Sequence, residues 1–148
     1  AGAETAAPAP AAEKTVLPLA GLHLLLAEDN ELNSEIATAL LEEQGASITA
    51  VENGRLALEA IQNAAPHTYD AILMDVMMPE MNGLEATRCI RAFEGKGPGE
   101  GTPIIAMTAN VFADDVKACL DAGMNSHVGK PLDMKVLIGE ILKYADAR

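Results

Sequence analysis

The stretch Ala71-Ile-Leu-Met-Asp75-Val-Met77-Met-Pro79 determines how the rest of the chain is interpreted. Its apolar start has the length of a strand buried on both faces, as in parallel sheets that are covered by helices. The apolar run ends in one carboxylate, Asp75, and a turn follows at Pro79. Ligands bind at the carboxyl ends of the strands in open parallel sheets, so Asp75 is a candidate functional residue. An aspartate at this place can also simply cap a loop. The residues at the ends of the other predicted strands distinguish between these two interpretations.

Five apolar runs of strand length alternate with segments of helical pattern. The predicted strands cover residues 22–27, 46–51, 70–75, 103–107 and 125–128. The predicted helices cover residues 31–44, 54–64, about 83–94 and 112–122, and a last helix is capped by Asp133. Asn53-Gly54 is interpreted as the turn before the second helix. This alternation is typical of an α/β protein with a parallel sheet, right-handed crossovers and helices on both faces.

The predicted helices carry apolar residues on one side. Leu32, Ile36 and Leu40 recur at four-residue spacing in the first helix, which places them on one face. Phe93 belongs to the apolar side of the third helix, and the last helix carries Val136.

Composition excludes several classes of function. The formal net charge of -12 argues against binding nucleic-acid phosphates and against a polybasic membrane anchor. Cys89 and Cys119 have no CxxC spacing, so neither a zinc site nor a disulfide framework is expected. No signal peptide is recognisable, and the longest apolar run, near residues 17–27, is too short to cross a bilayer. We therefore expect a cytoplasmic domain that contacts neither nucleic acid nor membrane directly.

The two ends of the chain differ in character. Residues 1–18 are rich in Ala and Pro and are expected to form a disordered linker. Residues 19–148 are expected to form one domain, which the length of the chain permits. A linker of this kind suggests that the domain belongs to a longer parent chain.

Charged and hydroxyl side chains gather at the predicted carboxyl edge of the sheet. The ends of four strands bring together Glu28, Asp29, Asp75, Thr108 and Lys130. Three neighbouring carboxylates repel one another unless a cation neutralises them, and a site with only oxygen ligands favours a hard ion such as Mg²⁺. Lys130 and Thr108 are suited to hold phosphoryl oxygens, and Asp75 is suited to be a nucleophile that forms an aspartyl phosphate.

The span from about residue 22 to 144 resembles a receiver domain of two-component signalling, most closely the receivers of hybrid sensor histidine kinases. The resemblance rests on Ala27-Glu-Asp-Asn30, residues 73–79, Met81-Asn-Gly83, Met107-Thr-Ala109 and Gly129-Lys-Pro131. It implies the three-layer, flavodoxin-like or CheY-like (βα)5 fold, with a five-stranded parallel sheet in the order 2-1-3-4-5.

The resemblance also implies the chemistry. Asp75 would accept a phosphoryl group from a phosphohistidine of a histidine kinase or a histidine phosphotransfer domain. Glu28, Asp29, Asp75 and the backbone carbonyl of Met77 would hold Mg²⁺; the family often has Asp at the position of Glu28. The Met77 side chain flanks the site and is expected to hinder the water that hydrolyses the phosphorylated form.

Further roles are implied for the later strand ends. Lys130 would pair with Asp75 and then with a phosphoryl oxygen, and Thr108 would shift toward that group. His127 occupies the position of a switch aromatic and is equally consistent with a strand-end residue that has no such role. Ala109 is small and leaves the nucleophile accessible, and Asn110 also controls access. The switching surface would be the fourth helix and fifth strand.

Alternatives from other classes remain open at this point. A pseudo-receiver would bind partners without accepting a phosphoryl group, although every site position holds a competent residue type. A haloacid dehalogenase-type hydrolase needs a second Asp where Met77 stands, and a flavodoxin needs a Ser/Thr-rich phosphate loop that is not present. A receiver is not a stand-alone enzyme, although its parent can be a membrane-bound kinase. We expect a monomer or weak dimer that docks partners through the first helix and the loops beside Asp75 and Lys130.

Overall fold

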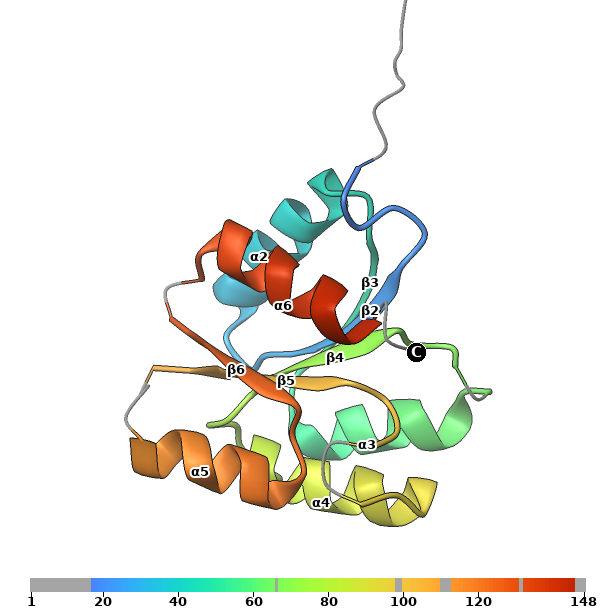
Figure 1. Ribbon diagram of the computed structural model, residues 1–148, viewed down its shortest axis with the longest axis vertical. Coiled ribbons are helices and arrows are strands. Elements are labelled where there is room, and N and C mark those ends of the chain that lie inside the picture. The colour runs from blue at the N-terminus through green and yellow to red at the C-terminus, as the bar shows by residue number, and fades with distance from the viewer. Residues whose placement is uncertain (1–16, 66, 98–99, 110–112, 131, 146–148) are drawn as a thin grey trace, which may run out of the picture.

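The computed structural model describes residues 17–65, 67–97, 100–109, 113–130 and 132–145 (Figure 1). Its parallel strands are β2 (His23–Ala27), β3 (Ser47–Val51), β4 (Ala71–Asp75), β5 (Ile104–Thr108) and β6 (Ser126–Gly129). They form one sheet in the order β3-β2-β4-β5-β6, which is the predicted order 2-1-3-4-5 counted along the chain. The helices are α2 (Glu31–Glu43), α3 (Gly54–Asn63), α4 (Gly83–Glu94), α5 (Ala113–Ala122) and α6 (Met134–Ala145). Helices α2 and α6 cover one face of the sheet, and α3, α4 and α5 cover the other (Figure 1). The predicted fold class is therefore confirmed.

Successive side chains of each strand enter two different apolar cores. Leu24 and Leu26 pack in the core under α2 and α6, whereas Leu25 and Ala27 pack in the core under α3, α4 and α5. The same alternation holds in the other central strands, because side chains of a strand point to opposite faces with a period of two. Full burial on both sides explains why β4 and β5 contain almost only apolar residues.

Three helices begin at the carboxyl edge of the sheet with an asparagine cap. The side chains of Asn30, Asn53 and Asn82 accept hydrogen bonds from backbone N–H groups in the first turns of α2, α3 and α4. Such a cap satisfies one of the free N–H groups of a helix and stabilises it by about 1 kcal/mol. The caps hold the loops that follow β2, β3 and β4 in short, defined conformations.

The three apolar residues that were predicted to share one face of the first helix do so, but that face does not pack on the core. Leu32, Ile36 and Leu40 are 63%, 50% and 38% exposed on α2, whereas Ala37 and Leu41 of the same helix are buried. The four-residue spacing placed these residues on one face of the helix and did not say which way that face points; Ala37 and Leu41 are the residues that pack in the core. These three exposed residues are called the α2 stripe below.

Two other apolar helix residues also lie at the surface, and one of them, Phe93, was expected on the apolar side of its helix. Phe93 is 53% exposed at the end of α4, and Val136 is 52% exposed in the first turn of α6. In α4, Ile90 is buried one turn before Phe93, and in α6 Leu137, the residue after Val136, is buried. Phe112, the predicted start of the fourth helix, lies outside the described residues.

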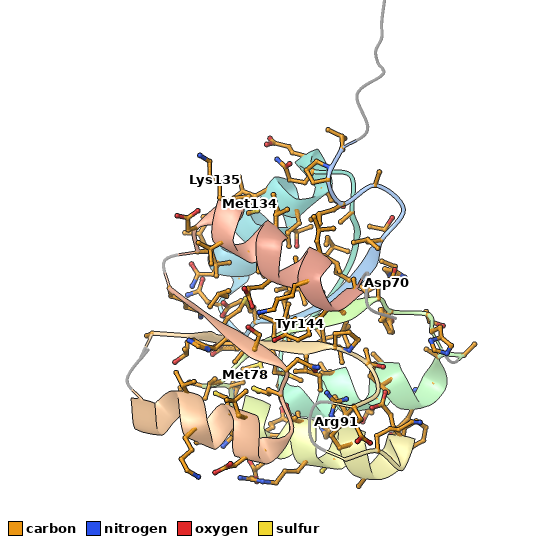
Figure 2. All side chains as sticks on the ribbon, viewed as in Figure 1. Asp70, Met78, Arg91, Met134, Lys135 and Tyr144 are labelled. Atoms are coloured by element: carbon orange, nitrogen blue, oxygen red, sulfur yellow. The ribbon has the colours of Figure 1, made fainter. Side chains whose placement is uncertain are left out.

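The amino edge of the sheet is held by a buried arginine. Arg91 of α4 is 4% exposed and donates to the carbonyl of Gly123 at 3.0 Å, the carbonyl of Thr102 at 2.9 Å and Oδ1 of Asn125 at 2.9 Å. Burial is the main cause that lowers the pKa of this guanidinium, and the ion pair with Glu94 opposes it. Arg91 lies on the face of α3, α4 and α5, away from α6 and its Met134 (Figure 2).

The remaining sequence-based expectations concern the chain ends and the membrane. Of the predicted linker, Leu17 and Pro18 are described, and the domain boundary at residue 19 stays a prediction. Leu19 is fully buried, and its N–H donates to the carbonyl of Gln44 at 2.8 Å. Within the part of the chain that the structure describes, the helices are too short or too polar to cross a bilayer.

Candidate metal centre

Three carboxylates meet at the carboxyl edge of the sheet, where β2 and β4 end. Each of Glu28, Asp29 and Asp75 offers an oxygen atom that lies within 4.8 Å of the others. Glu28 and Asp75 are each 5% exposed, and Asp29 is open to solvent. The backbone N–H of Glu28 donates to the carbonyl of Val51 at 3.1 Å, which continues the pairing of β2 with β3 and fixes the start of the loop.

Lys130 provides the positive charge beside these carboxylates. Its Nζ lies 3.0 Å from Oε1 of Glu28 and 3.1 Å from Oδ2 of Asp75. The N–H of Lys130 donates to the carbonyl of Thr108 at 2.9 Å, so the pairing of β5 with β6 sets its position. The residues two positions before Glu28, Asp75 and Lys130 all pack in the core under α2 and α6. Because side chains alternate along a strand, all three charged side chains therefore lie on that same side of the sheet.

The close packing of these charges changes their protonation. Burial is the largest cause that raises the pKa of Asp75 from 3.8 to about 6; the neighbouring Glu28 adds to the increase, and Lys130 opposes it. Burial also opposes the charge of Glu28, but hydrogen bonds from Lys130 and from the Asn30 N–H outweigh it and lower the pKa. Burial lowers the pKa of Lys130, and its two carboxylate partners more than compensate, so the net change is an increase. At neutral pH the site therefore carries more negative than positive charge.

The donor set fits a magnesium ion. Carboxylate oxygens and a nearby backbone carbonyl are the ligands that hard divalent cations prefer, and the excess of negative charge needs a cation. The Met77 N–H donates to Oδ1 of Asp75 at 3.3 Å, which keeps the backbone of this residue beside the cluster. Its side chain is 76% exposed. The assignment of Glu28, Asp29, Asp75 and the Met77 carbonyl as ligands stays a prediction.

Comparison with known families decides what kind of domain carries this site. The family model of the response regulator receiver domain matches residues 24–142, which is most of the chain. The chain belongs to the response regulator receiver domain family. The match includes every residue of the candidate site and, apart from His23, all residues of the five strands, so the resemblance stated from the motifs is confirmed.

Relatives of this receiver include both curated and solved proteins. The chain is 40% identical over 140 residues to Probable histidine kinase 1 of Oryza sativa subsp. indica. This alignment covers 76% of the chain and 14% of the rice protein. The chain thus spans about one-seventh of the length of that relative.

Solved structures agree with the fold. The receiver domain of sensor histidine kinase PA1611 from Pseudomonas aeruginosa PAO1 is 38% identical, with a TM-score of 0.74 over 86% of this chain and 99% of that chain. That structure has a magnesium ion coordinated in its active site cleft. The receiver domain of Ssk1 from Saccharomyces cerevisiae, solved with the histidine phosphotransfer protein Ypd1, is 26% identical, with a TM-score of 0.76 over 86% of this chain and 91% of that chain.

The remaining predicted residues of the receiver lie near the end of β5 and in β6. Thr108 ends β5 and is 6% exposed, and Ala109 follows it at the surface. His127 pairs in register with Ala106, whose side chain packs in the core under α3, α4 and α5. Thr108 is two positions beyond Ala106, so the strand alternation places Thr108 and His127 on the α5 side of the sheet. Asn110 lies outside the described residues.

Some contacts of the site were not anticipated from the sequence. Lys130 was expected to pair with Asp75, and its ammonium also contacts Glu28. Asn53 was expected only in a turn, and it caps α3 and lies 3.5 Å from Glu80 in the loop after Asp75. The cap could have been found from Asn53 alone, because asparagine before a helical pattern favours the N-cap. Its contact with Glu80 joins residues 27 positions apart in the chain, and no local sequence pattern predicts it.

Proposed function

We propose that this receiver accepts a phosphoryl group from a phosphohistidine onto Asp75, with Mg²⁺ as cofactor, as one step of a phosphorelay. The observation that carries the proposal is the position of Asp75: at a strand end, 3.1 Å from the Lys130 ammonium and in a cluster of carboxylates that needs a cation. Nucleophile, phosphoryl-binding cation and metal ligands are the parts that phosphoryl transfer requires.

The proposed reaction exchanges one bond for another. A carboxylate oxygen of Asp75 bonds to phosphorus, while the phosphorus–nitrogen bond of the phosphohistidine breaks and its electron pair returns to the imidazole ring. When bound, Mg²⁺ neutralises charge on the carboxylates and on the phosphoryl oxygens. Lys130 donates to a phosphoryl oxygen and keeps Glu28 as its second partner. Because Asp75 reacts as a carboxylate, its pKa of about 6 in the metal-free protein leaves it mostly ionised at neutral pH.

The proposed output is a change of the surface around α5 and β6. A phosphoryl group adds charge and acceptor oxygens at one point, which Thr108 can follow with its hydroxyl. Thr108 and His127 lie on the same side of neighbouring strands, so a shift of Thr108 changes the environment of the imidazole. This is the basis for assigning His127 to the switch.

The proposed donor docks on the α2 stripe. Large apolar side chains in a row on a helix surface are typical of an interaction site. Ile36 and Leu40 also line a groove that continues past Leu132 to Glu28 and Lys130, so the stripe leads directly to the proposed phosphoacceptor site. A helix bearing a phosphohistidine could cover the stripe and reach Asp75 at the same time.

The proposed parent is a hybrid histidine kinase in the cytoplasm. The rice relative is named a histidine kinase, and this chain corresponds to only 14% of it. The Ssk1 receiver was solved with a phosphotransfer protein, which supports a partner of the same class here.

The deciding experiment is phosphotransfer to the purified chain. Incubation with acetyl phosphate and Mg²⁺, and separately with a panel of phosphorylated histidine kinases and phosphotransfer domains, is expected to add one acid-stable, base-labile phosphoryl group. The group should be absent when EDTA replaces Mg²⁺ and in Asp75→Asn. Equal labelling of Asp75→Asn would refute the acceptor assignment, and binding of a donor without any labelling would support the pseudo-receiver instead.

A further inference from the structure

The loop after the proposed phosphoacceptor contains a residue in an unfavourable backbone conformation. Glu80 has φ = 64°, in the left-handed region, where its side chain makes the conformation costly by about 1 kcal/mol or more. A residue other than glycine persists there only when surrounding contacts hold it. The loop spans residues 76–82 and includes Met77, so its shape determines where the backbone carbonyl of Met77 lies.

The base of this loop is closed by its own ends. The N–H of Gly83 donates to the carbonyl of Val76 at 2.9 Å, and a Cβ at Gly83 would collide with the carbonyl oxygen of Asp75. The first turn of α4 is therefore packed directly on the backbone of Asp75. This contact fixes the two ends of the loop and leaves its tip, Glu80-Met81, to be held by something else.

The tip is held by the first residues of α3. Nε of Arg55 donates to Oε1 of Glu80 at 3.1 Å, and Nδ2 of Asn53 lies 3.5 Å from Oε2. The N–H of Gly54 donates to the carbonyl of Met81 at 2.9 Å. Three consecutive residues at the start of one helix thus contact two consecutive residues of the loop.

Gly54 permits this contact because it has no side chain. A Cβ at Gly54 would collide with the carbonyl oxygen of Met81 and would lie 2.9 Å from Cβ of Ala86. Asn53 is 5% exposed and is fixed by capping α3, where its Oδ1 accepts from the N–H of Leu56 at 2.8 Å. The contact is therefore between two rigid pieces of backbone, and the loop cannot move without moving α3 or breaking it.

The Arg55 guanidinium is itself oriented by a second carboxylate. Its Nη1 lies 2.6 Å from Oε2 of Glu59, one turn further along α3, while Nε contacts Glu80. The Glu59 contact restricts the arginine to the rotamer that reaches the loop. Arg55 also neutralises Glu80, which would otherwise add a further negative charge to the rim of an already acidic site.

We propose that Asn53-Gly54-Arg55 is a clamp that positions the Met77–Met81 loop and thereby sets the affinity of the site for Mg²⁺. The proposal rests on the proposed function, in which the Met77 carbonyl is a metal ligand. Arg55 and Gly54 are positioning residues, because they act through the loop and are not among the proposed metal ligands. Groups that orient metal ligands typically change metal affinity by about 10- to 100-fold when they are altered.

The test compares Mg²⁺ affinity with stability in matched variants, by titrating MgCl₂ into the full chain and following backbone amide signals by NMR. Gly54→Ala is expected to weaken Mg²⁺ binding by about tenfold or more. Arg55→Gln is expected to weaken it by roughly two- to fivefold, because the Arg55–Glu80 pair is partly exposed. Lys117→Gln, which breaks an exposed pair on α5 and leaves Arg55, Glu59 and Glu80 unchanged, is the control that should bind Mg²⁺ as the unchanged protein does.

Glu80→Gly separates positioning from general stability. Glycine adopts φ = 64° without strain, so this variant should be at least as stable to urea as the unchanged protein. It lacks the carboxylate that the clamp holds, so it should still bind Mg²⁺ more weakly. Hydrogen exchange of the amides of residues 76–82, measured without Mg²⁺, should be faster in Arg55→Gln and Glu80→Gly than in the control Lys117→Gln.

Two negative outcomes have different meanings. If the unchanged protein binds no Mg²⁺, the proposed function is wrong and the clamp has no metal to position. If it binds Mg²⁺ and both Arg55→Gln and Glu80→Gly bind equally well with unchanged loop exchange, the clamp is refuted while the proposed function stands. A Gly54→Ala variant that fails to fold does not affect this decision, because these two variants alter only exposed or partly exposed side chains.

Discussion

The Nζ atom of Lys130 is as close to Oε1 of Glu28, at 3.0 Å, as it is to Oδ2 of Asp75, at 3.1 Å. The lysine is therefore shared between a carboxylate proposed to react and one that does not. Sharing means that Lys130 keeps a counter-charge when Asp75 changes its chemical state. It also means that Glu28 has two roles: it contributes to the proposed metal site, and it orients the Lys130 ammonium.

Removing the charge of Lys130 should slow phosphorylation more than it disturbs the fold. We expect Lys130→Gln to take up a phosphoryl group from acetyl phosphate about a hundredfold more slowly, because a cationic donor to the phosphoryl oxygens is lost. Lys130→Arg should be intermediate, since a planar guanidinium cannot reproduce the ammonium contacts. Lys135→Gln, which changes an exposed lysine of α6, is the matched control. Labelling of Lys130→Gln at the normal rate would show that another group performs this role.

Asp75→Asn should stabilise the metal-free protein at neutral pH. Because folding raises the pKa of Asp75 from 3.8 to about 6, its contribution to stability is fully present below about pH 4 and is lost as the pH rises through 6. This difference corresponds to at most about 3 kcal/mol. Urea unfolding in EDTA should show the gain at about pH 7.5 and little gain at about pH 4.

The control for this pH dependence is Asp121→Asn, which changes an exposed carboxylate. Glu28 has the opposite pH dependence. Because folding lowers its pKa, its contribution to the free energy of unfolding is present above pH 4.5 and is lost as the pH falls. Comparing Asp75→Asn with the unchanged protein at each pH isolates the Asp75 part. A gain that is as large at about pH 4 as at about pH 7.5 would mean that burial of the Asp75 charge is not its cause.

Mg²⁺ should stabilise the folded chain by mass action. A free concentration of ten times the dissociation constant corresponds to about 1.4 kcal/mol in the free energy of unfolding. Asp29→Asn should abolish this gain and leave the metal-free stability close to normal, because Asp29 is exposed and Lys130 contacts the other two carboxylates. Glu35→Gln, an exposed acid on α2, should respond to Mg²⁺ normally. Stabilisation that persists in Asp29→Asn would remove this residue from the ligand set.

The α2 stripe should matter for a protein donor and not for a small one. Ile36→Lys is expected to weaken binding of the phosphorylated donor by about tenfold, because a central apolar contact is replaced by a charge. Labelling by acetyl phosphate should be unchanged. Val136→Lys is a closely matched control, because Val136 is 52% and Ile36 is 50% exposed. Equal loss of donor binding in both variants would place the docking surface elsewhere or implicate net charge alone.

Met77→Asn should shorten the lifetime of the phosphorylated form. Met77 is 76% exposed beside Asp75 and offers no hydrogen bond to a hydrolytic water, whereas an asparagine amide can orient one. An amide only orients the water and does not remove its proton, so its effect is smaller than that of a general base. We expect hydrolysis of the acyl phosphate to be about tenfold faster. The decay of acyl phosphate after removal of the donor measures it directly. An unchanged half-life would show that this side chain does not control entry of water.

The five buried parallel strands and the convergence of charged residues at one edge could be predicted because both depend on local patterns, whereas the order of the strands came from the resemblance to receiver domains. Alternating apolar runs indicate buried parallel strands, and Glu28, Asp75 and Lys130 each follow such a run directly. Lys130 lies 102 positions from Glu28, yet the sheet topology brings them together without any long-range information in the sequence.

The exposed sides of the helices could not be predicted in the same way. Apolar spacing marks Leu32, Ile36 and Leu40 as one face, but the spacing alone does not say whether that face meets the sheet. Surfaces that bind partners share the apolar character of a core, so pattern alone does not separate them. The contact of Arg55 with Glu80 depends on the left-handed conformation of one loop residue, which no propensity of glutamate indicates.

Arg91 gives the two rims of the sheet opposite mechanical characters. At the amino rim, its guanidinium is bonded to uncharged acceptors of the segments that lead into β5 and β6, in addition to the carboxylate of Glu94 on its own helix. At the carboxyl rim, the bonds join ionisable groups whose partners depend on proton, metal and phosphoryl occupancy. A chemical event at one rim can therefore redistribute bonds there while the opposite rim keeps the strands in register.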